Sequence, residues 1–363
     1  MSDKPGGLYY ADYLHLDKLL DAQHPESTKL GRTAHDEMLF IIVHQAYEIW
    51  FKQILFEIRS IVGMFNDDIV DDRQIGQMVA RLERVHKIQR LLIQQIDVLE
   101  TMTPLDFLEF RDLLIPASGF QSVQFKELEI CLGLKRHKRL KVDQEFIYSR
   151  LNEADRATMQ QAESQSSLLE VTEQWLERLP FLNFEDFDFW KEYESAVERM
   201  LERDRKIVED NPTLPEVVRK HQLTELEATA ARFAAILDAD KFKSLTESGD
   251  FQLSHSALLA AVFINLYRDE PMLQLPYRYL TCLVEVDELL TSWRSRHAIM
   301  VHRMLGAKIG TGGSSGHEYL HRTTRQNRVF LDLFNISTFL IPRSDLPKLP
   351  ANVIDSMRFR FGK

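Results

Sequence analysis

Cysteine is scarce in this chain, and it has neither a net positive charge nor a long apolar run. Only Cys131 and Cys282 occur among 363 residues, without the close spacing of a metal-binding pair, so a disulfide scaffold is excluded. The formal net charge of −10 argues against a nucleic-acid partner. The opening MSDKPGG has no apolar signal region, and no apolar run reaches the roughly 18 residues of a membrane span. We therefore expect a cytoplasmic protein that has no membrane partner.

Strand patterns and internal repeats are also missing, whereas helical periodicity recurs along the chain. Residues 35–62 contain neither glycine nor proline and predict a long helix, and residues 71–100 predict a second one. The polar stretch 134–167 indicates a solvated helical excursion. Further helices are expected at 9–23, 192–208, 214–238, 258–267 and 279–304. The sequence thus predicts an all-α protein, one domain over residues 1–363, with a helical bundle as its core.

The segment from His297 to Gly316, HAIMVHRMLGAKIGTGGSSG, joins the end of a helix to a loop with four glycines in seven residues. Backbone of this kind can approach a ligand closely. It is not a P-loop, because no Gly-Lys-Ser/Thr follows, and Ser315 stands where the dinucleotide fingerprint needs its last glycine. The loop also follows a helix instead of a strand, so a Rossmann turn is excluded.

Just beyond this loop, His317, Glu318 and His321 match the zinc-protease pattern of two histidines one helical turn apart with a glutamate between them. A zinc site also needs a third protein ligand. No glutamate occurs after Glu318, and no Gly-x-x-His continuation follows His321, so the two commonest completions are missing. A zinc metalloprotease is the alternative function that this pattern raises.

Two histidines and an arginine stand in apolar surroundings. His44 shares one face of the 35–62 helix with aromatic residues, and His297 lies near the end of the 279–304 helix. Arg111 lies among phenylalanines and leucines, where a guanidinium needs a carboxylate partner from the protein or from a ligand. Taken singly, each has an ordinary interpretation as a hydrogen-bonded core residue. Together they could form a haem pocket, with one histidine as axial ligand and the other over the open face.

Several blocks of the sequence resemble the tryptophan 2,3-dioxygenases. They are HDEMLFIIVHQAYEIWFKQILFEI, PASGFQSVQFKELE, HAIMVHRMLGAKIGTGGSSG, YRDEP at 267–271 and FNISTFLIPR at 334–343. The resemblance implies an all-α, homotetrameric, cytosolic enzyme with haem b, ferrous in the active state. Its reaction would insert both atoms of O2 across the indole 2,3 bond of L-tryptophan to give N-formyl-L-kynurenine, the first step of tryptophan degradation through kynurenine.

The resemblance also implies roles for the histidines. His297 matches the axial iron ligand, whereas His302 lies about 140° further round the helix. His44 matches the histidine that hydrogen-bonds the indole N–H, and because that N–H is a very weak acid, orientation is a safer role for His44 than general base. At His317 and His321 the family is expected to have tyrosine and a small or basic residue, so the zinc pattern falls where the family shows none.

Other matches are contacts to the substrate. Phe40 and Phe107 match apolar walls for the indole ring. Arg111 matches the partner of the tryptophan carboxylate, and Thr311 matches a hydroxyl beside its ammonium group. Each of these roles is implied by the resemblance alone.

The last matches lie at the edge of the expected pocket. Ser118 and Gly119 match hydroxyl and backbone contacts near haem and substrate. Tyr10 and Tyr13 match an N-terminal arm, residues 1–25, that docks on a neighbouring subunit and completes its pocket. Their spacing places both tyrosines on one face of a short helix.

Overall fold

Helices account for all the regular secondary structure in the described part of the protein. The computed structural model describes residues 7–65, 72–135, 148–149, 151–179, 187–306, 308 and 316–358, with the backbone alone described at 72, 316–319, 325 and 356. No strand occurs in these ranges, which confirms the predicted all-α class. None of the described helices combines the length and apolar character that crossing a membrane requires.

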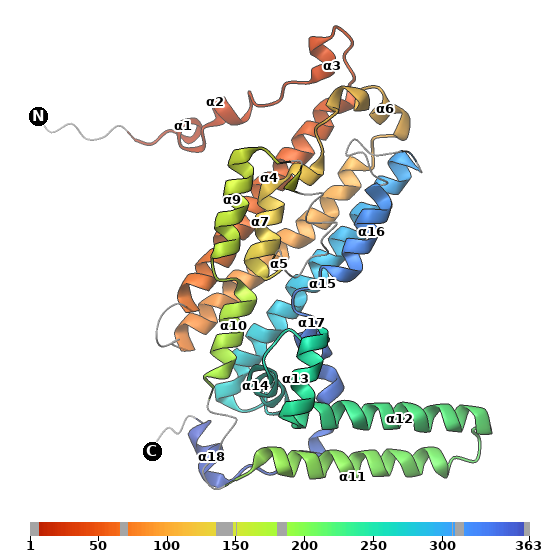
Figure 1. Ribbon diagram of the computed structural model, residues 1–363. Coiled ribbons are helices and arrows are strands. Elements are labelled where there is room, and N and C mark those ends of the chain that lie inside the picture. Colours follow the sequence, from red (N-terminus) through yellow and green to blue (C-terminus); the bar gives the residue numbers. More distant parts are fainter. Residues whose placement is uncertain are drawn as a thin grey trace, which may run out of the picture.

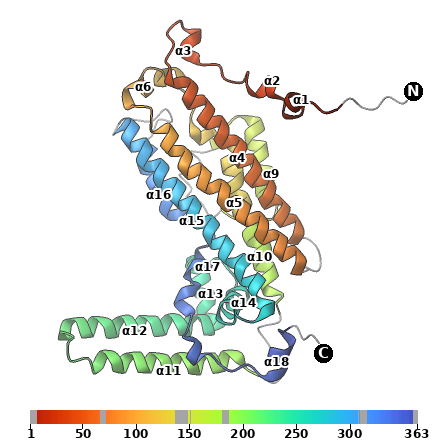
Figure 2. The same cartoon turned by 180° about the vertical axis from the view of Figure 1, so that it is seen from behind.

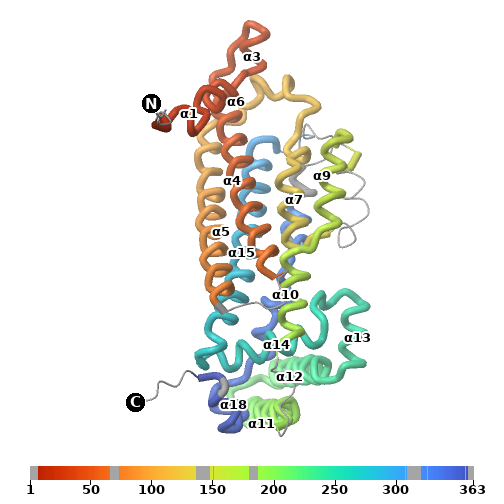
Figure 3. Tube along the Cα trace, turned by 90° about the vertical axis from the view of Figure 1, so that its left-hand side faces the viewer, coloured from red at the N-terminus to blue at the C-terminus, as the bar shows by residue number. Residues whose placement is uncertain are grey.

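Three long helices form the centre of the molecule. Helix α5 (Asp72–Leu99) packs along both α4 (Asp36–Phe65) and α15 (Pro271–Leu305), and the three lie side by side in Figures 1, 2 and 3. The predictions for α4 and α5 are confirmed to within about three residues at each end. Their apolar positions recur every three or four residues, so one face of each helix is buried.

Helix α15 is longer than the sequence predicts, because it begins at Pro271 and not at Tyr279. The prediction was wrong at this end because Pro276 reads as a helix breaker. Pro276 lies in the second turn of α15 and is buried. At that position it removes a single backbone hydrogen bond, which the packing of the surrounding helix offsets.

Shorter helices cover this centre. Helix α7 (Val123–Leu132) and helix α10 (Leu168–Glu177) pack on α4, and α16 (Gly316–Gln326) packs on α15. Within the predicted polar excursion, α9 (Glu153–Ser164) is helical and packs on α7, through a small apolar cluster of Ile130, Leu151, Met159 and Ala162. Residues 136–147 and 150 of that excursion lie outside the described residues.

Two short helices, α3 (Glu26–Lys29) and α6 (Pro104–Leu108), lie at the end of the bundle near the N-terminal arm, and a larger group of helices lies at the other end (Figure 1). There α11 (Phe189–Glu209) and α12 (Glu216–Leu237) form an antiparallel hairpin that projects sideways (Figure 1). Helix α14 (His255–Leu266) is buried on nearly all sides, as its apolar sequence predicts. The other helices at this end are α13 (Ala239–Ser248), α17 (Leu331–Asn335) and α18 (Ala351–Ser356).

The N-terminal segment differs from its prediction as one amphipathic helix. It forms two short helices, α1 (Tyr10–Leu14) and α2 (Leu16–Leu19), separated by His15 in the left-handed conformation with φ of 51°. Neither helix buries a residue, and the segment extends away from the bundle (Figure 1). A helix this short is marginal without packing. Since no described residue of its own chain covers it, packing on the bundle does not stabilise one continuous helix here.

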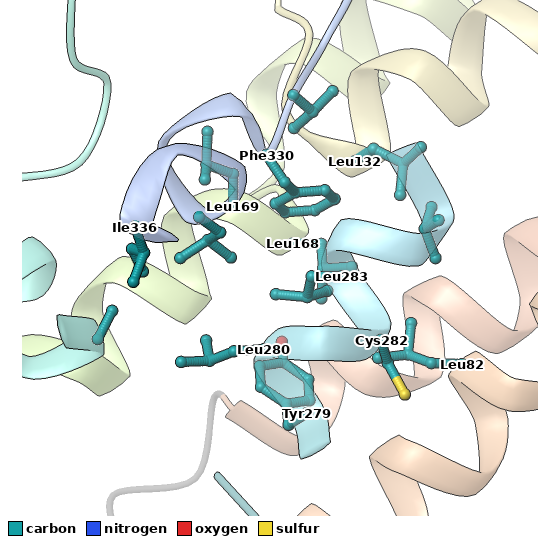
Figure 4. Packing of buried hydrophobic residues seen from close by; sticks show 14 of the residues in the cluster. Leu82, Leu132, Leu168, Leu169, Tyr279, Leu280, Cys282, Leu283, Phe330 and Ile336 are labelled. Atoms are coloured by element: carbon teal, nitrogen blue, oxygen red, sulfur yellow. The ribbon is translucent and has the colours of Figure 1, made fainter. Parts of the chain in front are cut away.

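The core is continuous from the central helices to the hairpin end. Figure 4 shows side chains from α5, α7, α10 and α15, together with Phe330 and Ile336 at the two ends of α17, meeting around Leu283, which has no solvent exposure. Among them, the Tyr279 hydroxyl lies 2.7 Å from the Thr172 hydroxyl, so this polar pair is satisfied inside the core.

Truncation of Leu283 should therefore be costly. Leu283→Ala removes fully buried methyl groups, and we expect the free energy of unfolding to fall by about 3 kcal/mol. Leu91→Ala, on α5 but 46% exposed, is the matched control and should cost less than about 1 kcal/mol. Urea unfolding followed by circular dichroism measures both. Equal losses would contradict the assignment of Leu283 to the core.

Candidate active site

A partly open cavity of about 260 Å³ lies among α4, α7, α15 and α16. Its volume is several times the ~30 Å³ that one water molecule occupies in the liquid. Most of the lining is apolar, from residues such as Phe51, Phe125 and Met300. Among its polar lining residues are His44, Glu48, Ser118, Arg294 and His297.

His297 borders this cavity from α15. Its ring stacks on that of Trp293, with centroids 5.4 Å apart and an interplanar angle of 1°. Burial, together with the nearby His44, lowers the pKa of His297 from 6.5 to about 4, so the ring is neutral at pH 7. Its ring nitrogens have no hydrogen bond to any other residue that the structure describes. A neutral imidazole in this state keeps a lone pair for a metal ion.

His44 borders the cavity from α4, and its tautomer is fixed by a hydrogen bond. Its Nδ1 lies 2.7 Å from the backbone oxygen of Phe40. Since a carbonyl oxygen can only accept, Nδ1 carries the proton and Nε2 of the neutral ring keeps the lone pair. Burial lowers the pKa of His44, against the opposing effects of the Phe40 carbonyl and Glu48. The side chain is solvent-accessible because it borders the cavity, yet protein atoms crowd it enough to disfavour its charged form.

Aromatic rings extend from His44 toward the start of the next element. The Phe40 ring lies 4.0 Å from that of His44 and 5.7 Å from that of Phe107, measured between centroids. Phe110, which is fully buried, packs edge-on against both phenylalanines. Arg111 follows at the start of the 3₁₀ helix Arg111–Leu114 and is half-buried. Phe40 and Phe107 therefore belong to one aromatic cluster with His44, and Arg111 follows this cluster in the chain. None of the three is among the residues that line the cavity.

The segment before α7 forms another wall of the cavity. Ser118 and Gly119 both line it, and the Ser118 hydroxyl caps the 3₁₀ helix Gly119–Gln121 by accepting from Phe120 N at 3.4 Å. A Cβ atom added at Gly119 would meet no protein atom within 4 Å. Packing inside the protein therefore does not require glycine at position 119. The open space beside Gly119 leaves room for a ligand.

The remaining predicted residues are not among the described residues that line this cavity. Tyr10 and Tyr13 lie on the arm and are 71% and 66% exposed. Thr311 lies outside the described residues, as do the side chains of His317 and Glu318 on α16. In the part of the chain that the structure describes, no three His, Cys, Asp or Glu side chains cluster as metal ligands.

Sequence reasoning missed a buried ionic group beside His297. Arg294, one turn before His297, donates to Glu129 Oε1 at 2.8 Å and to the backbone oxygen of Asn327 at 2.8 Å. Lys126 lies 3.2 Å from the other oxygen of Glu129. These bonds tie α15 to α7 and to the end of α16. Helical spacing places Arg294 near His297, but nothing in the sequence identifies Glu129 as its partner.

Trp293 was also missed, although its spacing was informative. It precedes His297 by four residues, which places the two rings on the same face of α15. The parallel stacking limits rotation of the imidazole. A single neutral histidine with room on the cavity side could hold a metal that arrives in its own macrocycle.

Fold and cavity define an all-helical protein with a two-histidine pocket suited to haem. Comparison with known sequences is more specific. The family model for tryptophan 2,3-dioxygenase matches residues 2–340. Proteins named tryptophan 2,3-dioxygenase are 51% identical in Alteromonas mediterranea (98% of this chain, 97% of the relative), 49% in Bdellovibrio bacteriovorus (98% and 99%) and 48% in Dictyostelium discoideum (97% and 88%). The chain belongs to the tryptophan 2,3-dioxygenase family, and that membership implies haem as cofactor.

The iron ligand can be tested by substitution. His297→Ala should fold but bind haem more than about 100-fold more weakly, since even an outer-shell change at a metal site costs about 10–100-fold. The ratio of haem to protein after reconstitution is the measurement. His302→Ala is the control, because His302 is exposed on the same helix. Full haem occupancy in His297→Ala, with loss in His302→Ala, would transfer the ligand role to His302.

Proposed function

We propose that the cavity beside His44 and His297 holds haem b, with His297 as axial ligand of the iron, and that L-tryptophan is oxidised there. The family activity is that of a dioxygenase, an oxidoreductase that acts on L-tryptophan and O2. In the proposed reaction both oxygen atoms enter across the indole 2,3 bond to give N-formyl-L-kynurenine. The observation that carries the proposal is the pair of neutral imidazoles on one largely apolar cavity.

Haem, when bound in its ferrous state, would supply the iron chemistry that activates dioxygen. The protein's own contribution is placement. His297 offers a neutral nitrogen, and Trp293 holds its ring in one plane. With haem and substrate in place, the largely apolar lining would disfavour water near the reacting groups, and this would strengthen each electrostatic contact inside the cavity.

His44 would orient the indole. Its Nε2 lone pair can accept the indole N–H, because its Nδ1 proton is already donated to the Phe40 carbonyl. The lowered pKa makes His44 a weaker base, and an indole N–H is itself a very weak acid. Both facts favour hydrogen bonding over proton removal.

The amino-acid part of the substrate would contact residues beside the aromatic group. Arg111 would pair with the carboxylate through its planar fork, which matches a carboxylate in two parallel hydrogen bonds. Phe40 and Phe107 would flank the indole, and Ser118 and Gly119 would contact haem and substrate. Thr311 would accept from the ammonium group, and this role lies outside the described residues.

The arm supports an oligomeric arrangement. Leu8, Tyr9, Tyr10, Tyr13 and Leu20 are each at least 66% exposed. A cluster of aromatic and aliphatic side chains of this kind is costly in water. We infer that residues 1–25 dock on a neighbouring subunit of a homotetramer, where Tyr10 and Tyr13 complete the pocket. Residues 1–363 would form one domain that functions in the cytoplasm, in keeping with its two free cysteines.

The proposed contact between Arg111 and the carboxylate of L-tryptophan can be tested separately from the other substrate contacts. Arg111→Lys keeps the charge but loses the planar fork. We expect affinity for L-tryptophan to fall by about 10-fold or more, and affinity for tryptamine, which has no carboxylate, to change by less than about 3-fold. Equilibrium titration of the haem absorption band measures both. If the two ligands weaken equally, Arg111 has only a structural role.

The proposed role of His44 predicts a pH dependence. Protonation removes the Nε2 lone pair, and the pKa of His44 lies below 6.5. Therefore kcat/KM for L-tryptophan should stay level as the pH falls from 8 to 6.5 and should decline only at lower pH. His44→Ala should lack this acid-side decline. A decline centred at or above pH 6.5 that vanishes in His44→Ala would contradict the neutral ring assigned here.

A further inference from the structure

Glu48 is a carboxylate at the edge of the cavity that the proposed chemistry does not use. It lies on α4 one turn after His44 and lines the same cavity. Its Oε1 accepts from the Ser122 hydroxyl at 2.6 Å, and its Oε2 accepts from the Gln124 side-chain amide at 2.9 Å. The same amide lies 3.1 Å from the backbone oxygen of Glu48. Both carboxylate oxygens are therefore bonded to the start of α7.

The partners of Glu48 are themselves fixed. Ser122 is the N-cap of α7, and its side-chain oxygen accepts from Phe125 N at 3.3 Å while its proton is donated to Glu48. The carboxylate also lies at the positive end of the α7 dipole, which favours a negative charge. No cation forms an ion pair with Glu48 among the described residues. Neutral donors and the helix end hold it in place.

This attachment lies next to the wall of the cavity. Ser118, Gly119 and Phe120 line the cavity, and Ser122, which follows them after one residue, lines it as well. Within that wall, Ser118 N donates to the Gln121 side chain at 3.0 Å, so the turn closes on itself. The bonds from Ser122 and Gln124 then fasten the closed turn to the part of α4 that carries His44.

We propose that Glu48 is a positioning residue for tryptophan binding, because its two hydrogen bonds fix the 118–122 wall against the turn of α4 that bears His44. The inference rests on the proposed function of the cavity. Glu48 does not touch the reacting atoms. Its effect is to keep the spacing between the wall and the imidazole constant, so that the indole can meet both at once.

A link between α4 and α7 could also be simply structural, and the chain contains a matched control for that role. Arg59 on α4 pairs with Glu127 on α7, joining the same two helices. Neither of these residues lines the cavity. Glu127→Ala therefore removes a carboxylate link between the same helices without altering the cavity wall.

The test uses the full-length haem-loaded protein and compares Glu48→Ala, Glu48→Gln and Glu127→Ala. For Glu48→Ala we expect KM and the dissociation constant for L-tryptophan to rise by about 10-fold, with kcat changed by less than about 3-fold. Haem content should stay equal to that of the unmutated protein. Glu48→Gln should recover part of the affinity, because its amide can bond Ser122 and Gln124 after Gln124 turns over.

Glu127→Ala should leave KM unchanged even where it lowers the thermal midpoint. Ser122→Ala should raise KM in the unmutated background and have little further effect in Glu48→Ala, because both changes remove the same bond. An unchanged KM in Glu48→Ala, or an equal rise in Glu127→Ala, overturns the proposal.

If Glu48→Ala does not fold, Gln124→Met tests the proposal instead. This substitution removes the amide that donates to Glu48 and keeps the side-chain length. A rise in KM in Gln124→Met supports the positioning role of Glu48, and an unchanged KM overturns it. Failure of the proposed function itself would appear differently. The unmutated protein would then show no spectral response to L-tryptophan, whatever the behaviour of the Glu48 variants.

Discussion

The proposed site depends on keeping two imidazole rings neutral beside one largely apolar cavity. Burial lowers the pKa of both His44 and His297, because a charged ring would lose its hydration there. Neutrality gives each ring a lone pair, and the Phe40 carbonyl assigns that lone pair to Nε2 of His44. The central helices supply the burial, since α4 carries one ring and α15 carries the other.

Helix α7 connects the two sides of this arrangement. Near its start, Ser122 and Gln124 bond to Glu48 on α4, and further along it Glu129 bonds to Arg294 on α15. The second of these bonds is a buried ion pair, and loss of one partner would leave the other charge uncompensated in the interior. One short helix thus fixes the helices of both histidines, which gives the cavity a defined width before any ligand binds.

Much of the frame could be predicted from periodicity, because α4 and α5 bury one face along their whole length. The start of α15 could not, because Pro276 is tolerated only through packing with distant parts of the chain. The arm was predicted as one helix from its local apolar pattern. Such a pattern does not show whether other parts of the chain pack against the helix. His44 and His297 stood out as polar residues in apolar stretches. Glu48 and Glu129 did not, because their partners lie far away in sequence and ordinary surface glutamates look the same.

The most direct test of this account is the absorption spectrum of the purified, reduced protein with and without L-tryptophan. We expect a Soret band from bound haem that shifts or changes in intensity when L-tryptophan is added, and the same titration with His44→Ala should require more substrate. A protein that contains stoichiometric zinc and no haem would contradict the account and favour a protease. A colourless protein that still binds no haem after reconstitution would contradict it as well, and would indicate a helical scaffold without catalytic activity.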